Sequence, residues 1–293
     1  MKFFFSLVFL KYELYNVTIP RADRHLLSNN GKHVSYYINY ERLFFMLRYL
    51  LTLLFIFFFL LLSLPYLGLE WILGKFNREA SDLRQLHVVQ TVFKIILWIC
   101  GTKVIVIGEE NVPTDRPVLY VANHKSIFDI IITYIRCPRR TGYVSKDVIK
   151  KVPSLNLWMK RLYCLFLNRS DIKEGLKMIL AGIDHIKNGI SMCIFPEGTR
   201  NKTDDLILPF KEGSFKMSEK TGCPIVPMAL TNTSAIFEDH FPYVKPTTVI
   251  LEYGAPIYPN ELEKEERKKI GAYCQHTIEE MLKKNATHAA LHS

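Results

Sequence analysis

Residues 117–129 read PVLYVANHKSIFD, and this stretch indicates the fold class because an apolar run is followed at once by polar residues. The run from Pro117 to Ala122 has the length and composition of a buried strand. An ideal helix turns by roughly 500° over five residues, so His124 and Asp129 cannot share a helical face. The stretch therefore predicts a strand, a turn that carries His124, and a helix that begins near Asp129.

From residue 102 onward, β-rich runs alternate with helical patterns. The clearest helical pattern covers residues 172–186, where isoleucine and leucine recur at spacings of three and four. Asp171 and Glu174 form a pair typical of a helix start, and Gly189 is typical of a helix end. The alternation predicts an α/β fold with one mixed, largely parallel sheet flanked by helices. The expected strands are Thr102 to Gly108, Pro117 to Ala122, Thr141 to Ser145, Tyr163 to Leu167, Ser191 to Phe195, Pro224 to Leu230 and Thr247 to Tyr253, and a charged helix is expected from Asn260 to Lys284.

The His124 turn is a candidate catalytic centre. Open α/β sheets place their chemistry beyond the carboxyl ends of strands. There the Asp129 carboxylate can hold one ring nitrogen of His124 and leave the other free as a general base. A structural interpretation fits this motif equally well, with Asp129 as a favourable charge at a helix N-terminus and His124 as a polar turn residue.

A second motif favours the catalytic interpretation. Residues 194–200 read IFPEGTR and again follow a predicted strand, while FKEGSF at 210–215 supplies Lys211 and FLNRSD at 166–171 supplies Arg169. Arg169 and Arg200 lie just beyond strand ends, and Arg200 and Lys211 lie near glycines, which let backbone amides approach an anion closely. Such an arrangement suits a phosphate, which arginine binds through two parallel hydrogen bonds.

Four blocks, NHKSIFD, YCLFLNR, IFPEGTR and CPIVPMAL, resemble in their order and separation the glycerolipid acyltransferases, the bacterial 1-acyl-sn-glycerol-3-phosphate acyltransferases among them. The resemblance covers residues 44–284, and the pairing of H-x4-D with FPEGTR makes it specific. One departure stands out, since the second block usually ends in Asp-Arg and here Asn168 precedes Arg169.

The resemblance implies transfer of a fatty acyl group from acyl-CoA or acyl carrier protein to the sn-2 hydroxyl of lysophosphatidic acid, which gives phosphatidic acid. His124 acts as the base and Asp129 orients it, with no acyl-enzyme, because Ser126 lies in the same turn and the chain has no G-x-S-x-G elbow. No cofactor and no metal are expected. Glu197 is expected to organise the cations or bind a glycerol hydroxyl, and the Gly198 region to stabilise the oxyanion. The candidate substrate-binding residues are Arg169, Glu197, Gly198, Thr199, Arg200 and Lys211.

Other functions remain open at this point. Within the same family, the acceptor is alternatively glycerol 3-phosphate or another lysolipid. A membrane-bound thioesterase would also use a histidine and a carboxylate, but it does not account for the predicted phosphate cations. A non-catalytic membrane adaptor needs only an anchor and a basic surface.

A membrane anchor is predicted before the α/β domain. The run from Tyr49 to Leu69 has no charged residue and is long enough to cross roughly 30 Å of hydrocarbon. The second apolar run, Val88 to Gly101, carries Lys94 and is too short to cross unaided. Pro65 and Gly68 are expected to break the first run into a helical hairpin with the second, as the resemblance implies, and a single span is the alternative. Basic residues flank both ends of the first run, so the positive-inside rule gives no orientation.

Charge and cysteine content set the expected surroundings. The net charge of +10 comes without a nucleic-acid-binding motif, which favours an anionic membrane surface and phosphorylated substrates as partners. The six cysteines have no metal-ligand spacing and are expected to be buried thiols in a reducing compartment, which places the catalytic domain on the cytoplasmic side of the cell membrane. We expect an N-terminal extension over residues 1–41, an anchor over 42–101 and the acyltransferase domain over 102–293.

Overall fold

The computed structural model describes residues 31–167 and 171–291. The chain divides into two compact units, Met1–Leu43 and Phe44–Ser293. In the first unit, the described residues form the beginning of helix α2 (Gly31–Leu73). The second unit contains the sheet and all the candidate site residues.

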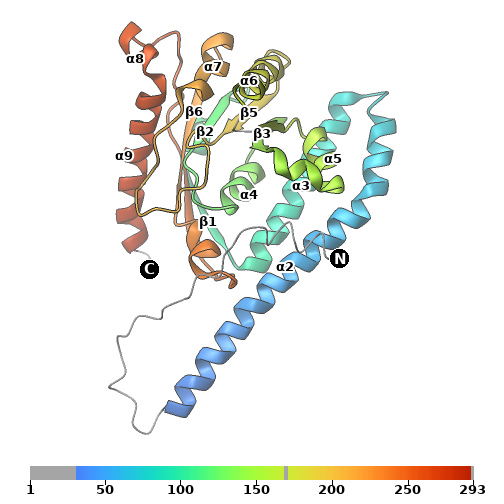
Figure 1. Cartoon of the computed structure of the whole chain (residues 1–293), viewed down its shortest axis with the longest axis vertical. Coiled ribbons are helices and arrows are strands. Elements are labelled where there is room, and N and C mark those ends of the chain that lie inside the picture. Colours follow the sequence, from blue (N-terminus) through green and yellow to red (C-terminus); the bar gives the residue numbers. More distant parts are fainter. Residues whose placement is uncertain (1–30, 168–170, 292–293) are drawn as a thin grey trace. The chain divides into compact units, whose positions relative to one another are not determined.

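A seven-stranded sheet forms the centre of the second unit, in the order β1-β7-β6-β2-β5-β3-β4 (Figure 1). Neighbouring strands are parallel except β6 and β7, which are antiparallel, so the prediction of a mixed, largely parallel sheet is confirmed. Each of the seven expected strands is present, with ends that differ by at most two residues. The strands are β1 (Lys103–Ile107), β2 (Leu119–Ala122), β3 (Thr141–Lys146), β4 (Leu165–Leu167), β5 (Ser191–Ile194), β6 (Ile225–Thr231) and β7 (Thr248–Tyr253).

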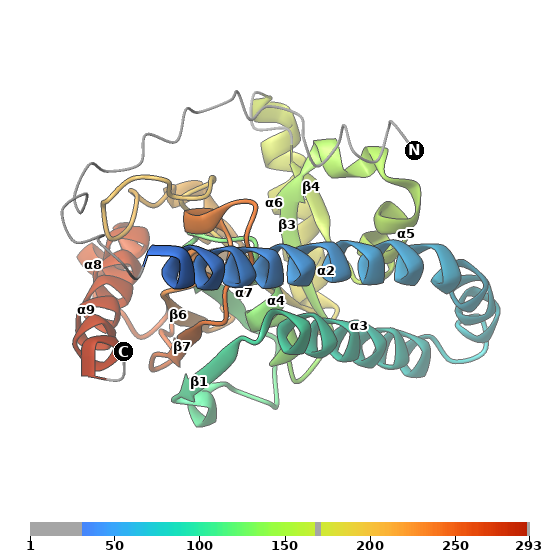
Figure 2. The ribbon, with the colours of Figure 1, turned by 90° about the horizontal axis from the view of Figure 1, so that it is seen from below.

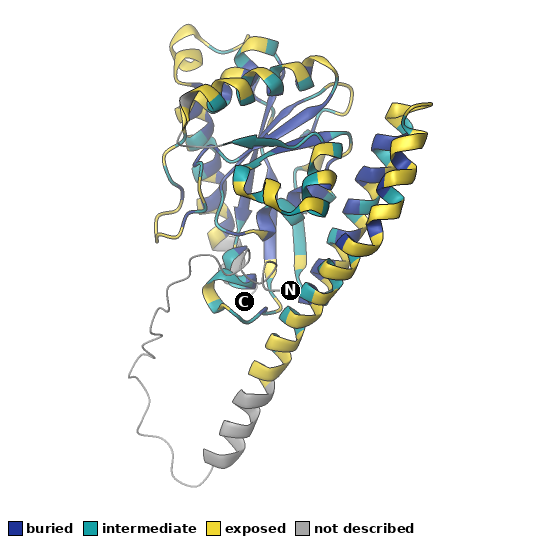
Figure 3. Ribbon diagram, turned by 45° about the vertical axis from the view of Figure 1, so that its right-hand side comes forward, coloured by how far each residue is buried: buried dark blue, intermediate teal, exposed yellow. Residues whose placement is uncertain are grey.

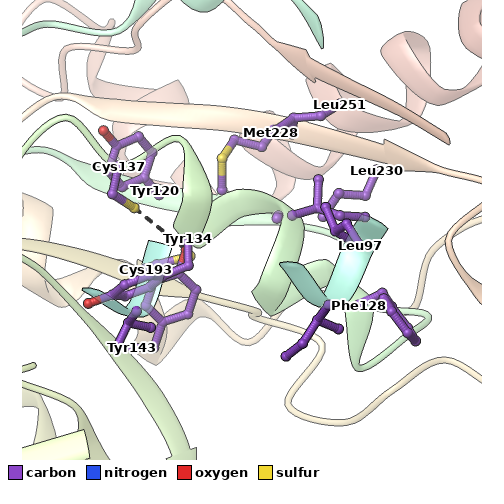
Figure 4. Packing of buried hydrophobic residues seen from close by; sticks show 14 of the residues in the cluster. Leu97, Tyr120, Phe128, Tyr134, Cys137, Tyr143, Cys193, Met228, Leu230 and Leu251 are labelled. Carbon is purple, nitrogen blue, oxygen red and sulfur yellow. Dashed lines mark hydrogen bonds between the residues drawn. The ribbon is translucent and has the colours of Figure 1, made fainter. Parts of the chain in front are cut away.

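Helices cover both faces of the sheet, because alternate strand residues point to opposite sides. In β2, Tyr120 and Ala122 pack into one core and Leu119 and Val121 into the other. The first core joins the sheet to α3 (Arg78–Cys100), α4 (Phe128–Ile135) and α5 (Pro153–Arg161), and Figure 4 shows part of it. The second core joins it to α6 (Ile172–Lys187), α7 (Lys216–Thr221) and α9 (Ile270–Leu291).

Helices α2 and α3 form the predicted hairpin, but the chain does not reverse at Pro65 and Gly68. Helix α2 continues through both residues to Leu73, and the turn lies at residues 74–77 (Figure 2). The prediction of a break at Pro65 is therefore wrong. The turn is fixed instead by side chains, because Asn77 caps α3 and Arg84 of α3 binds both carboxylate oxygens of Glu70 at 2.8 Å.

The hairpin differs from the rest of the unit in what it exposes. The segments Glu41–Leu73 and Arg78–Cys100 are both long and apolar enough to cross a membrane. Many large apolar side chains on α2 are exposed, while one face of α3 is buried against the domain (Figure 3). Exposed apolar surface of this extent marks a membrane or protein contact.

The C-terminal helix also differs from its predicted form. The expected single helix is divided into α8 (Lys264–Lys268) and α9 (Ile270–Leu291). Just after the division, in the first turn of α9, the Glu212 carboxylate accepts a hydrogen bond from the backbone N–H of Gly271. Helix α9 packs on the sheet, against β6 and β7. The N-cap Asp171 of α6 was predicted correctly, since its carboxylate accepts from the backbone of Lys173 and Glu174.

Candidate active site

His124 lies in the turn between β2 and α4, and Asp129 lies in the first turn of α4. The Nδ1 atom of His124 is 2.8 Å from Oδ2 of Asp129. The same oxygen accepts hydrogen bonds from the backbone N–H groups of Lys125 and Ser126, both at 2.8 Å. A carboxylate that accepts from Nδ1 fixes the ring tautomer and leaves Nε2 as the acceptor of a proton.

Phe195 holds the other side of the imidazole. Its ring stacks on the His124 ring with centroids 4.2 Å apart and planes inclined by 22°. Phe195 directly follows β5, the neighbour of β2 in the sheet. Among the described residues, Nε2 of His124 has no hydrogen-bond partner, and 13% of the side chain is exposed. The ring is thus fixed at Nδ1 and on one face, and Nε2 remains available for chemistry.

Glu197 has a different role from the one predicted. Its Oε1 accepts from the backbone N–H of His124 at 2.6 Å, and its Oε2 accepts from that of Leu208 at 3.0 Å. The residue is only 4% exposed, and burial raises the pKa of its carboxyl group. Both oxygens therefore hold backbone, and Glu197 supports the His124 turn from within the protein.

Gly198 and Lys211 lie together. Gly198 has φ of +72°, a left-handed conformation that favours glycine, and a Cβ atom there would lie 2.8 Å from Nζ of Lys211, so the lysine side chain passes directly over this position. The Gly198 N–H donates to the carbonyl of Phe195 at 2.9 Å. The Gly198 N–H, which the sequence suggested as a donor to the oxyanion, is therefore already hydrogen-bonded within the protein. Thr199, the next residue, is exposed.

Arg200 is linked to the His124 turn by the carboxylate of Glu238, a residue that the sequence did not single out. The Nη1 atom of Arg200 donates to Oε1 of Glu238 at 2.9 Å. Glu238 also accepts from the Ile127 backbone at 2.8 Å and from the Ser126 hydroxyl at 2.6 Å. Because β6 is parallel to β2, the segment that follows β6 begins at the same edge of the sheet as the His124 turn, which is the signal that would have drawn attention to Glu238.

Ser126 and Asn123 are both structural. Ser126 is fully buried, and its hydroxyl accepts from the Phe128 backbone while it donates to Glu238, so it is not placed as a nucleophile. Asn123 holds the turn by hydrogen bonds. Its side-chain amide donates to the Leu230 carbonyl and accepts from the Leu230 N–H, which ties the end of β2 to β6.

The remaining expectations concern Arg169, the cysteines and a metal ion. Arg169 lies outside the described residues. All six cysteines are free thiols, and five of them are buried. Across residues 31–167 and 171–291, His, Cys, Asp and Glu side chains form no group of three that could hold a metal ion.

Comparison with known proteins gives consistent matches. The model of the acyltransferase family matches residues 103–231. The 1-acyl-sn-glycerol-3-phosphate acyltransferase of Saccharomyces cerevisiae is 30% identical over 204 residues, which cover 69% of this chain and 66% of the yeast protein. The enzyme of the same name from Borreliella burgdorferi is 36% identical over 152 residues, which cover 51% of this chain and 60% of that protein. The chain thus spans a little under two thirds of the length of these relatives.

A solved structure shares the fold. The crystal structure of the 1-acyl-sn-glycerophosphate (LPA) acyltransferase PlsC from Thermotoga maritima superposes with a TM-score of 0.66. The match covers 81% of this chain and 97% of the other, at 24% identity. The likeness extends over most of both chains, so it includes more than the region that the family model matches.

Proposed function

The chain belongs to the acyltransferase family, and from this premise we propose that it acylates the sn-2 hydroxyl of 1-acyl-glycerol-3-phosphate to give phosphatidic acid. The acyl donor is a thioester, either acyl-CoA or acyl carrier protein, and no cofactor takes part. The observation that carries the proposal is the His124–Asp129 pair with a free Nε2, next to an arginine held at the same turn. The names of the relatives support the acceptor.

The reaction follows from the residue types. An alcohol is a weak nucleophile near neutral pH, and an imidazole is the side chain whose usual pKa suits a general base there. Nε2 of His124 removes the proton of the 2-hydroxyl while the oxygen attacks the thioester carbonyl. Asp129 stabilises the imidazolium that results. When the tetrahedral intermediate collapses, the carbon–sulfur bond breaks and His124 returns the proton to the leaving thiolate.

The oxyanion of the intermediate needs hydrogen-bond donors other than the Gly198 N–H, which already donates to Phe195. We assign this role to the N–H groups of Thr199 and Arg200, because neither has a partner among the described residues. These donors belong to the same turn as Glu197, which holds the backbone of His124, so the base and the donors are parts of one rigid arrangement.

The acceptor phosphate is bound by cations in this proposal. Arg200 and Lys211 both lie in the segment that follows β5, and we add Arg169 on the strength of its sequence motif alone. Arginine offers five N–H donors, and Glu238 uses only part of this capacity, so Arg200 can also bind a phosphate. This arrangement favours a phosphorylated acceptor over a neutral lysolipid.

Membrane attachment is the last part of the proposal. The α2–α3 hairpin enters the bilayer with its exposed apolar side chains and holds the site at the surface where lysophosphatidic acid resides. The free thiols support a reducing surrounding, and we therefore place the catalytic domain on the cytoplasmic side.

The test is a profile of donors and acceptors with the full chain purified in detergent. The donors are acyl-CoA and acyl carrier protein, and the acceptors are lysophosphatidic acid, glycerol 3-phosphate and a neutral lysolipid. Phosphatidic acid is the expected product, and His124→Ala should lower kcat by a factor of about 10² to 10⁴. His276→Ala, an exposed histidine on α9, is the matched control. Rapid hydrolysis of the thioester without an acceptor would favour a thioesterase instead.

A further inference from the structure

One carboxylate connects the two sequence motifs of the site. Glu238 belongs to neither motif, yet it accepts from Ser126 and Ile127 of the His124 turn and from Arg200 of the second motif. The contact with Ser126 joins residues 112 positions apart in the chain. Glu238 thus joins the turn that carries the base to the side chain assigned to the phosphate, in addition to the link that Glu197 makes with the His124 backbone.

The segment that carries Glu238 is itself fixed from behind. Phe237 stacks on Tyr49 of α2, with ring centroids 5.3 Å apart, and packs edge-on against Phe241. Ile236 is fully buried, and its carbonyl accepts from the Lys245 backbone. Because residues before and after Glu238 are held by these contacts, the carboxylate is a fixed point toward which Arg200 orients.

Arg200 has few other restraints. Its side chain is 37% exposed, whereas that of Glu238 is only 17% exposed. A long side chain that is held at a fixed point loses its rotamer freedom before the ligand binds, so less entropy is lost on binding. Burial raises the pKa of Glu238, and the nearby Arg200 charge opposes this shift, which is consistent with a charge that the arginine stabilises.

We propose that Glu238 is a positioning residue that holds Arg200 in place for the phosphate of the acceptor. The inference rests on the proposed function, since it gives the phosphate group of that acceptor as the ligand of Arg200. Glu238 acts through Arg200, and it does not touch the substrate. Its removal therefore weakens acceptor binding and leaves saturation by the thioester donor unchanged.

The experiment is a double-mutant cycle with Glu238→Gln and Arg200→Ala in the full chain. Glutamine keeps the size of the side chain and a hydrogen-bond acceptor for the Ile127 backbone, but it removes the charge that holds Arg200. Because hydrogen bonds between charged groups are stronger than those between neutral groups, we expect KM for lysophosphatidic acid to rise roughly tenfold to a hundredfold. The donor KM should stay within about twofold of the original value, and kcat should change less than the acceptor KM.

The second half of the cycle separates positioning from a merely structural role. In the Arg200→Ala background, Glu238→Gln should change the acceptor KM little, because the residue through which it acts is gone. Asp239→Asn, an exposed neighbour on the same segment, is the matched control and should behave as the original chain. If Glu238→Gln raised the donor KM equally, or if its effect on the acceptor were the same with and without Arg200, the inference would be overturned.

Equilibrium binding distinguishes this inference from the proposed reaction. The affinity of lysophosphatidic acid for the full chain, and that of an uncharged monoacylglycerol, are measured without a donor by calorimetry in detergent. If the effects of Glu238→Gln and Arg200→Ala on affinity are coupled for the phosphorylated ligand and not for the uncharged one, the positioning role is supported. If the chain forms no phosphatidic acid, only the proposed reaction is refuted. Unfolding midpoints of each variant confirm that the compared proteins are folded.

Discussion

The His124 turn and the α2–α3 hairpin are stabilised in opposite ways. In the turn, the polar side chains are buried and bind backbone, with Asn123, Asp129 and Glu197 all at most 4% exposed. In the hairpin, apolar side chains face outward, and Phe76 and Trp98 are 86% and 80% exposed. The turn is held by hydrogen bonds within the protein, whereas the apolar side chains of the hairpin need an apolar surrounding to cover them. Changes in the turn should therefore affect chemistry and stability, and changes in the hairpin should affect location alone.

The largest effect is expected from Asp129→Asn. Three donors converge on Oδ2 of Asp129, and an amide at this position cannot stabilise the imidazolium of His124. We expect kcat to fall by a factor of about 10² to 10⁴ while binding to vesicles stays unchanged. Steady-state kinetics and vesicle sedimentation measure the two properties. A variant that kept full turnover would show that His124 does not need this carboxylate.

Glu197→Ala should combine a loss of stability with a loss of activity. The substitution leaves the backbone N–H groups of His124 and Leu208 without their acceptor. An unsatisfied buried group costs about 1–3 kcal/mol, so the free energy of unfolding should fall by this order. Urea unfolding measures it. Glu219→Ala, whose carboxylate binds the exposed Lys216 on α7, is the control and should cost less than about 1 kcal/mol.

Local contacts explain why the sequence predicted the turn well. The Asp129 carboxylate binds residues three to five positions earlier, so the motif itself contains both partners. The seven strands were predicted because a β-rich run bounded by turn residues forms a buried strand whichever strands it pairs with. Glu238 and Phe195 were missed, because their contacts with the turn depend on how distant strands are ordered in the sheet.

The hairpin shows a different limit of sequence reasoning. Pro65 signals a helix break, but the energetic cost of one proline is of order 3 kcal/mol and tertiary contacts can exceed it. Here the Glu70–Arg84 pair and the Asn77 cap place the reversal beyond residue 73. For Glu197, the motif identified the residue but not its hydrogen-bond partners. The sequence alone does not distinguish a buried carboxylate that accepts from two backbone N–H groups from a carboxylate that binds a ligand.

A smaller effect is expected from Phe76→Ala at the tip of the hairpin. Phe76 packs little against the protein, so the substitution should leave kcat in detergent unchanged. Partial transfer of an aromatic side chain into lipid contributes about 1 kcal/mol, which corresponds to roughly fivefold weaker binding to anionic vesicles. Tyr273→Ala, on α9 across the sheet, is the control and should bind vesicles as before. Equal weakening by both variants would show that the hairpin is not the membrane-binding region.

The smallest effect is a pH dependence of stability that comes from Glu238, which contacts the His124 turn, and not from the hairpin. Burial raises the pKa of Glu238 in the folded protein above its ordinary value, so between these two values the folded chain holds a proton that the unfolded chain releases. Stability should therefore be highest below the ordinary pKa of glutamate and fall as pH rises through the folded value. Glu238→Gln lacks this titration, so its unfolding free energy relative to the original chain should increase with pH over the same window. Arg200 lowers and Asp129 raises the pKa of Glu238, so Arg200→Ala should extend the window to higher pH. Urea unfolding at a series of pH values measures both shifts, and a difference that did not vary with pH would mean that Glu238 is ionised as easily in the fold as in the unfolded chain.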